Sequence, residues 1–215
     1  AVVKIVHDQW FMNYSNPVWK KSAHECLDSM KLYPEKSRQQ FNYVIDWMND
    51  WACVREHGLG TKLPWDRKWV IEALSDSTIY MAYYTIAHLI EKEDLDSIDD
   101  KVFDYLFLGI GNAPAKIHTI KEMKTEFDYW YPMDFRNSGK DLIQNHLTFC
   151  IFNHTAIFPK SNWPKSFGVN GWVTVDGKKM SKSKGNFILL NELAAQHSVD
   201  TSRITILSGG EGLDD

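Results

Sequence analysis

The chain has 215 residues, of which 44% are hydrophobic, so it is long enough to bury a core and to form one large domain. Its formal net charge of −4 gives no overall basic surface, so any contact with a nucleic acid would have to be local. Three widely spaced cysteines form no CxxC pair, and no apolar run reaches the roughly 18 residues of a membrane span. The composition therefore argues against a membrane protein, a zinc knuckle and a disulfide framework, and it fits a reducing compartment such as the cytoplasm.

The first 74 residues are predicted to hold a strand, two helices and a loop-rich segment. Residues 1–12 have the pattern of a strand and its exit. Apolar residues recur at helical spacing in 17–31 and again in 36–50. Glycine, proline and three tryptophans gather in 51–70, which indicates loops.

The middle of the chain is predicted to be mainly helical. Residues 75–91 are strongly apolar and predict one continuous helix. An acidic and polar stretch at 92–99 indicates a surface connection. Helical patterns follow at about 99–107 and 115–128. The Tyr-Trp-Tyr-Pro run at 129–132 is predicted to be a short buried strand.

The last third alternates between predicted strands, loops and helices. A Ser-Gly-Lys-Asp turn at 138–141 precedes a helix, and a strand at 167–175 ends in an Asp-Gly turn. The helices are predicted at 142–157, 189–197 and 200–207. The order of strand, phosphate-type loop, helix, strand, mobile loop and helix predicts an α/β fold with a parallel sheet. In such sheets ligands lie at the carboxyl ends of the strands.

A basic run follows the second of these strands. Four lysines fall within seven residues, at Lys178, Lys179, Lys182 and Lys184. Ser181 and Ser183 add hydroxyl donors, and Gly185 permits a sharp turn. Such a loop can place ammonium groups on a triphosphate and stabilise charge that develops on a leaving pyrophosphate. The alternative is a solvated basic loop with no ligand.

The turn at 138–141 has the residues of a nucleotide contact. Gly139 permits close approach of the backbone to a ligand. The Asp141 carboxylate can accept hydrogen bonds from both hydroxyls of a ribose, or it can cap the helix that follows. Because a triphosphate-type loop lies about 40 residues further on, the ribose interpretation is favoured.

Three more side chains are candidates for a small-molecule pocket. His146 lies near the start of the helix that follows Asp141, so it can face the ligand cleft, although a satisfied core histidine is the alternative. Ser77 and Tyr80 open the apolar helix and suit a pocket for an aliphatic side chain, or simply a capped core helix. His154 on the same helix as His146 is interpreted as structural.

The amino-acid sequences of five stretches resemble those of one known family. The Lys-Met-Ser-Lys-Ser run with its Gly-Asn tail resembles the KMSKS signature of class I aminoacyl-tRNA synthetases. The motifs SDSTIY, SGKDLI and GLGTKLPW resemble those of leucyl-tRNA synthetases of the archaeal and eukaryotic-cytosolic type. The isoleucyl, valyl and methionyl enzymes have different residues in the equivalent motifs. The matching stretches lie at 2–11, 52–65, 75–80, 138–147 and 179–186, so they span essentially the whole chain.

The resemblance implies a fold and a division of the chain. It implies an α/β fold that is the second half of a Rossmann-type class I synthetase catalytic domain, with inserted helical connective segments. Residues 1–74 would be the connective segment after the editing insertion and the entry to the catalytic core. Residues 75–215 would be the second half of the catalytic domain with the KMSKS loop.

The resemblance also implies an activity and a role for each site residue. Leucine and ATP, with Mg²⁺, would give leucyl-adenylate and pyrophosphate, and leucine would then pass to tRNA(Leu). Lys179 and Lys182 would be the catalytic residues, with Lys182 acting in the transition state. The ATP-binding set would be Gly139, Asp141, Met180, Ser181, Lys182 and Ser183. The leucine-binding set would be Ser77, Tyr80 and His146, and no protein metal site is expected.

One family signature does not occur in these residues. The HIGH tetrapeptide of the first catalytic half is absent from the sequence, so we expect an upstream segment or a second polypeptide to supply it. The strand-like start and the abrupt end agree with an expectation that both ends lie inside a larger architecture. The competing hypothesis is a non-catalytic, synthetase-derived module that binds a nucleotide or a partner. Intact lysines, ribose carboxylate and pocket residues argue against it.

Overall fold

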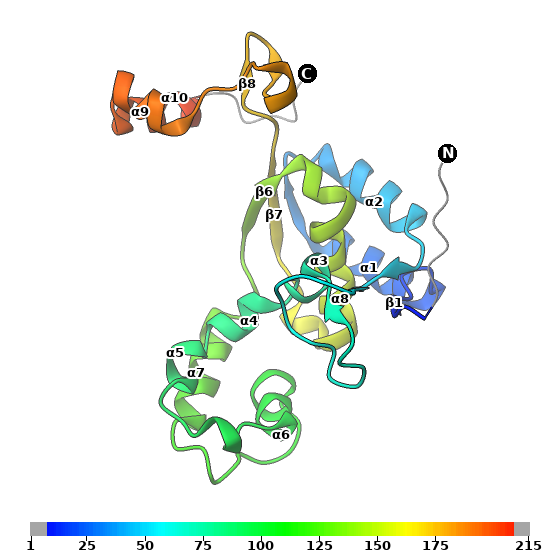
Figure 1. Cartoon of the computed structure of the whole chain (residues 1–215). Coiled ribbons are helices and arrows are strands. Elements are labelled where there is room, and N and C mark those ends of the chain that lie inside the picture. The colour runs from blue at the N-terminus through cyan, green and yellow to red at the C-terminus, as the bar shows by residue number, and fades with distance from the viewer. Residues whose placement is uncertain (1–7, 209–215) are drawn as a thin grey trace.

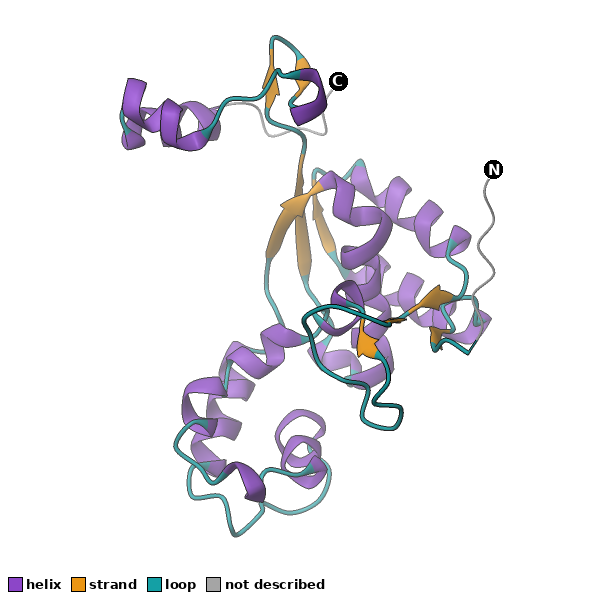
Figure 2. Ribbon diagram, in the orientation of Figure 1, coloured by secondary structure: helices purple, strands orange, loops and turns teal. Residues whose placement is uncertain are grey.

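A three-stranded parallel sheet is the centre of the fold. The computed structural model describes residues 8–208. The strands β2 (Lys31–Tyr33), β7 (Ser166–Asn170) and β6 (Arg136–Gly139) lie in the order β2-β7-β6, and both pairings are parallel. Figure 2 shows these strands side by side. Four of the five residues of β7 are buried, as expected for a central strand of a parallel sheet. The predicted α/β class with a parallel sheet is confirmed.

Three helices pack together on one side of the sheet and contribute residues to the main core (Figure 1). They are α1 (Pro17–Ser29), α2 (Ser37–Trp47) and α8 (Thr148–Ile157). Asn16 caps α1, because its side-chain oxygen accepts hydrogen bonds from the backbone N–H groups of Val18 and Trp19. The aromatic ring of Tyr14 stacks on Phe149 of α8 at 4.9 Å between centroids, which joins the start of α1 to α8.

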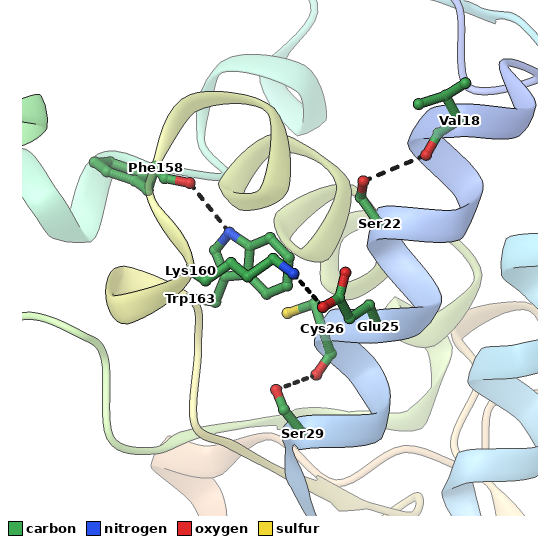
Figure 3. Close-up of polar contacts among 8 residues, drawn as sticks. All are labelled: Val18, Ser22, Glu25, Cys26, Ser29, Phe158, Lys160 and Trp163. Atoms are coloured by element: carbon green, nitrogen blue, oxygen red, sulfur yellow. Dashed lines mark hydrogen bonds and ion pairs between the residues drawn. The ribbon is translucent and has the colours of Figure 1, made fainter.

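Polar contacts fasten α1 to the segment that leads from α8 into β7 (Figure 3). Lys160 forms an ion pair with Glu25 of α1, and its ammonium lies 5.6 Å from the ring centroid of Trp163. The indole Nε1 of Trp163 donates to the Phe158 carbonyl at 3.1 Å. These contacts set the path of the chain into β7, whose far end leads to the lysine loop (residues 178–186).

Two short antiparallel ribbons precede the middle of the chain. Strand β1 (Phe11–Met12) pairs with β3 (Trp51–Ala52), and β4 (Val54–Arg55) pairs with β5 (Val70–Ile71). The strand predicted over residues 1–12 lies largely outside the described residues, and β1 is the part of it that the structure describes.

A helical lobe extends from the sheet between β5 and β6 (Figure 1). The short helix α3 (Ala73–Asp76) precedes the lobe (Figure 1). The helices of the lobe are α4 (Tyr80–Tyr84), α5 (Ala87–Ile90), α6 (Asp100–Phe103), η2 (Asp104–Leu108) and α7 (Ile120–Trp130), with the 3₁₀ turn η1 (Leu95–Ser97) between α5 and α6. The Glu93 carboxylate accepts hydrogen bonds from the N–H groups of His118 and Thr119, at 3.2 and 2.7 Å, and so holds the start of α7.

The single helix predicted for 75–91 is wrong in detail, because the structure divides this segment into α3, α4 and α5. Hydroxyl groups compete for backbone partners at the breaks: Ser77 donates to the Ala73 carbonyl at 2.6 Å and Thr85 to the Ala82 carbonyl at 2.7 Å. The β-branched residues Ile79 and Ile86 carry φ values of −123° and −119° at the same points.

The buried strand predicted for 129–132 is also wrong. Helix α7 continues to Trp130, and Tyr129 and Trp130 are 77% and 58% exposed. Only Tyr131 turns inward, where its ring stacks on Phe127 at 4.9 Å. A run of aromatic residues resembles a strand in sequence, but the spacing of four between these two rings is helical. The strand of the sheet begins later, at Arg136.

The predicted helix at 142–157 and the strand at 167–175 are each divided. The helical segment starts as the 3₁₀ turn η3 (Lys140–Leu142), passes through the π-helical turn η4 (Ile143–Leu147) and continues as α8. Strand β7 stops at Asn170, and 171–173 separate it from β8 (Thr174–Val175). The expected boundary at residue 74 stays a prediction, and in the structure β2 and β7 from the two sides of it share one sheet.

The C-terminal part leaves the sheet beyond β7 (Figure 1). It consists of a hairpin of β8 and β9 (Lys178–Lys179), the 3₁₀ turn η6 (Lys182–Lys184), α9 (Leu190–His197) and α10 (Val199–Ser208). In the part of the chain that the structure describes, no helix has the length and apolar character needed to span a lipid bilayer.

Candidate active site

The end of β6 forms the first part of the site. Gly139 is the last residue of β6, and Asp141 lies in the turn η3 directly after it. A side-chain carbon built on Gly139 would lie 2.6 Å from Oδ1 of Asp141, which is too close for any real contact. The glycine therefore lets the exposed Asp141 carboxylate fold back over the strand end. This position, at the carboxyl end of a parallel strand, is the one predicted for a ligand contact.

His146 and Ser77 meet although 69 residues separate them. His146 lies in η4 and is 5% exposed, and its Nε2 is 2.7 Å from Ser77 Oγ. Its Nδ1 is 2.8 Å from Nη2 of Arg136 on β6. Burial, and then the nearby Arg136 charge, hold the pKa of His146 below its ordinary value. Two of the three residues expected to bind the amino acid are thus in contact.

Tyr80, the third of these residues, makes a different contact. It begins α4, and its ring packs edge-to-face on Tyr84 of the same helix with 5.0 Å between centroids. Its side chain remains 38% exposed, so it is open to a ligand or a partner.

The lysine loop is displayed by a tight hairpin. Asp176 and Gly177 have φ values of 52° and 69°, the left-handed pair that a two-residue type I′ turn requires. Strands β8 and β9 pair through Thr174 with Lys179. The twist of this turn matches that of paired strands, so the Asp-Gly pair projects the loop away from the sheet.

Asn186 closes the lysine loop. Its Oδ1 accepts a hydrogen bond from the Ser181 backbone N–H at 2.9 Å, and its Nδ2 donates to the Lys179 carbonyl at 3.1 Å. Gly185 ends the turn η6 with a φ of 67°. The Gly-Asn tail therefore has a structural role, because it holds the two sides of the loop together.

The loop presents its charges to solvent. The side chains of Lys178, Lys179, Lys182 and Lys184 are all exposed. The hydroxyls of Ser181 and Ser183 lie 2.8 Å apart, and Met180 is half-buried beside them. Ammonium groups and hydroxyls gathered in this way suit a polyphosphate.

Trp172 links the two predicted ATP-binding segments, and the sequence interpretation missed it. The ammonium of Lys179 lies 3.3 Å from the Trp172 ring centroid, and that of Lys140 lies 5.9 Å from it. Lys140 belongs to the Ser-Gly-Lys-Asp turn and Lys179 to the lysine loop. The only sequence pattern that points to this contact is an aromatic residue between a buried strand and a basic hairpin.

His154 lies apart from these groups, in the core. Its Nε2 accepts a hydrogen bond from the Tyr131 hydroxyl at 2.5 Å, and its Nδ1 donates to the Cys150 carbonyl at 2.7 Å. Burial lowers the pKa of His154 to about 4. Its contacts agree with the structural role expected for it.

Among residues 8–208 no group of three or more His, Cys, Asp and Glu side chains is arranged to hold a metal ion. The site therefore consists of cations, hydroxyls, a carboxylate and a buried imidazole.

The family model of tRNA synthetases class I (I, L, M and V) matches residues 3–215. The chain belongs to this family. The leucine–tRNA ligase of Methanothermobacter thermautotrophicus is 53% identical over 211 residues, which are 98% of this chain and 22% of that protein. The leucine–tRNA ligase of Pyrococcus horikoshii is 51% identical over 232 residues, covering 98% of this chain and 24% of that protein. The resemblance to archaeal-type leucyl-tRNA synthetases is confirmed.

This class I synthetase chain spans less than a quarter of the length of these curated relatives. Among solved structures, it resembles the methionyl-tRNA synthetase of Mycobacterium tuberculosis bound by methionyl-adenylate. The TM-score is 0.48 with 18% sequence identity, and the match covers 88% of this chain and 32% of that one.

Proposed function

We propose that this chain supplies the KMSKS half of the active site of a leucine–tRNA ligase. The assembled enzyme activates leucine with ATP and transfers it to tRNA(Leu). One observation carries the proposal. An exposed lysine loop follows β7, while Gly139 ends the neighbouring strand β6 and Asp141 follows in η3, with Trp172 approached by lysines of both segments. The names of the archaeal relatives support the choice of leucine.

The first step needs charge stabilisation more than proton transfer. The leucine carboxylate attacks the α-phosphorus of ATP, and the bond between that phosphorus and the pyrophosphate oxygen breaks. The carboxylate is already a nucleophile, so no general base is required. Lys182 and Lys179 then stabilise the negative charge that develops on the departing pyrophosphate. ATP enters as its Mg²⁺ complex, so the ion is part of the substrate.

The remaining residues position the two reactants. The Asp141 carboxylate accepts hydrogen bonds from the ribose hydroxyls of ATP, and Gly139 admits the nucleotide close to the strand end. Met180, Ser181 and Ser183 line the phosphates beside Lys182. Ser77, Tyr80 and His146 shape the leucine pocket. Holding the carboxylate and the α-phosphorus together lowers the entropic part of the barrier.

The other half of the site comes from outside these residues. The HIGH tetrapeptide does not occur in the sequence, so an upstream half of the catalytic domain completes the ATP site. In this proposal residues 1–74 connect the editing insertion to the core, and residues 75–215 form the second catalytic half. The enzyme works in the cytoplasm, where tRNA(Leu) is charged.

Amino-acid-dependent ATP–pyrophosphate exchange tests the proposal. The chain is assayed alone and then mixed with a polypeptide that carries the HIGH-bearing half, with leucine, isoleucine, valine or methionine. We expect leucine-specific exchange only in the mixture. Exchange by the chain alone would refute the need for a second half. A folded chain that supports no exchange in any mixture would indicate a non-catalytic binding module.

A further inference from the structure

Three residues from separate elements form a continuous polar chain beside the proposed leucine pocket. Arg136 lies on β6, His146 in η4 and Ser77 directly after α3. Arg136 Nη2 is 2.8 Å from His146 Nδ1, and His146 Nε2 is 2.7 Å from Ser77 Oγ. The Ser77 hydroxyl is also 2.6 Å from the Ala73 carbonyl oxygen.

The donor and acceptor groups of these residues fix the direction of each hydrogen bond in this polar chain. A guanidinium can only donate, so Nδ1 of His146 accepts from Arg136. A neutral imidazole with an acceptor at Nδ1 carries its proton at Nε2, and Nε2 therefore donates to Ser77 Oγ. The Ser77 hydroxyl then donates its own proton to the Ala73 carbonyl, which can only accept. Both ring nitrogens of His146 and the Ser77 hydroxyl have partners of the correct type only when His146 is neutral.

We propose that Arg136 is a positioning residue that holds His146 neutral and makes its ring an apolar wall of the amino-acid pocket; this rests on the function proposed above. Both ring nitrogens are engaged by protein groups, so the imidazole has only carbon atoms to offer to a bound side chain. An aliphatic side chain such as that of leucine fits such a wall, and a polar one finds no partner there.

The charges around His146 explain why Arg136 is needed. Arg136 opposes protonation of the ring from the side of β6, while Glu72, which precedes α3, favours it. Burial also disfavours the charged ring. Without Arg136, only burial would oppose the effect of Glu72, and Nδ1 would be free to take up a proton or to turn toward the ligand.

Kinetics of the reconstituted enzyme test this role. We expect Arg136→Met to raise the KM for leucine by about 10-fold or more, because a buried polar atom loses its partner, and to change kcat much less. As the pH falls from 8 to 6, the KM of the variant should rise more steeply than that of the wild type. Arg136→Lys keeps a cationic donor and should recover most of the affinity. Arg67→Met, an exposed arginine in the 56–69 loop, is the matched control.

A direct measurement separates this inference from the proposed function. Long-range ¹⁵N–¹H NMR of the histidine rings, on the full chain alone, reports the tautomer of His146 without any substrate. We expect the neutral form with its proton on Nε2 at pH 7 in the wild type, and a ring that takes up a proton at higher pH in Arg136→Met than in the wild type.

The possible outcomes are distinct. A wild-type ring that carries its proton on Nδ1, or that is charged at pH 7, would overturn the positioning role. An Arg136→Met variant with unchanged tautomer and unchanged KM would overturn it as well. Absence of leucine-dependent exchange in every assembly would refute the proposed function, while the NMR result would still decide what Arg136 does.

Discussion

The ammonium of Lys179 lies 3.3 Å from the ring centroid of Trp172, so one of the two lysines proposed to be catalytic rests on an aromatic face. Lys140 approaches the same ring at 5.9 Å. A cation over an indole is stabilised by about 0.5–2 kcal/mol, depending on how far it is desolvated. If Lys179 leaves the ring to reach a phosphate, as we expect, the lost contact opposes phosphate binding.

Replacing the ring should make the lysine more available. We expect Trp172→Leu to lower the KM for ATP in the exchange assay by about 2–5-fold, which corresponds to about 0.5–1 kcal/mol of lost cation–π attraction. Trp172→Phe retains a ring and should change the KM by less. A KM that rises in Trp172→Leu would mean that the indole orients Lys179 in the bound state and does not restrain it.

Lys182 should carry the largest single effect on rate. On removal of a charge-stabilising group from a transition state, the usual loss is about 2.7–4 kcal/mol, so Lys182→Ala should lower kcat for exchange by about 10²–10³-fold. Its exposed position predicts no loss of fold, which circular dichroism can verify. Lys121→Ala, an exposed lysine on α7, is the control that should keep full activity. Equal rates for the two variants would remove Lys182 from the mechanism.

A methyl group at Gly139 should disturb the nucleotide site alone. The added carbon would lie 2.6 Å from Asp141 Oδ1, and the φ of Gly139, −72°, is one that alanine adopts without strain. We therefore expect Gly139→Ala to displace the carboxylate and raise the KM for ATP, with an unchanged melting temperature. Ser138→Ala, next to Gly139 on β6, should leave the KM for ATP near that of the wild type. If Gly139→Ala binds ATP normally, Asp141 is not a ribose contact.

Burial of His154 should make stability depend on pH. In the unfolded chain this histidine has a pKa near 6.5, whereas the folded protein lowers it to about 4. Between these values the unfolded state binds more protons. The free energy of unfolding should therefore fall as the pH decreases from 6.5 to 4, by up to roughly 3 kcal/mol from this residue, and His146 adds to it in the same direction.

Urea unfolding at pH 7 and pH 5 measures this dependence. His154→Gln should weaken the dependence on pH and also lower stability at pH 7, because the Tyr131 hydroxyl loses its acceptor. His197→Gln, an exposed histidine on α9, should keep the wild-type dependence. The same slope in all three proteins would show that His154 is not the group that titrates.

The three cysteines should differ in reactivity. Burial raises the pKa of the Cys26 and Cys150 thiols to about 12, and both side chains are inaccessible. Cys53 is only partly buried, and its pKa is raised less strongly. We expect iodoacetamide at pH 8 to modify Cys53 first, and the other two only when urea unfolds the chain, as followed by peptide mass spectrometry. Rapid modification of Cys150 in the folded protein would contradict the packing of α8.

The sequence by itself determined the parts of the site that are local. The lysine run, the Asp-Gly turn before it and the Ser-Gly-Lys-Asp turn are contiguous, and their backbone shapes follow from glycine and from short polar side chains. The parallel sheet was also predictable from the sequence, because the order of strands, loops and helices along the chain indicates it. The family resemblance rests on the same contiguous sequence motifs, and the match to the family model confirms it.

Only the tertiary structure decided which distant residues meet. Arg136, His146 and Ser77 come from three elements, and no spacing along the chain marks them as partners. The contact between Trp172 and Lys179 could be recognised only in the structure, where the hairpin places Lys179 over the ring. The break of the predicted helix 75–91 is a further case, since the Ser77 hydroxyl bonds back to Ala73 while its other side faces His146. Such contacts depend on how the helices pack on the sheet, because packing sets which polar groups must satisfy one another away from water.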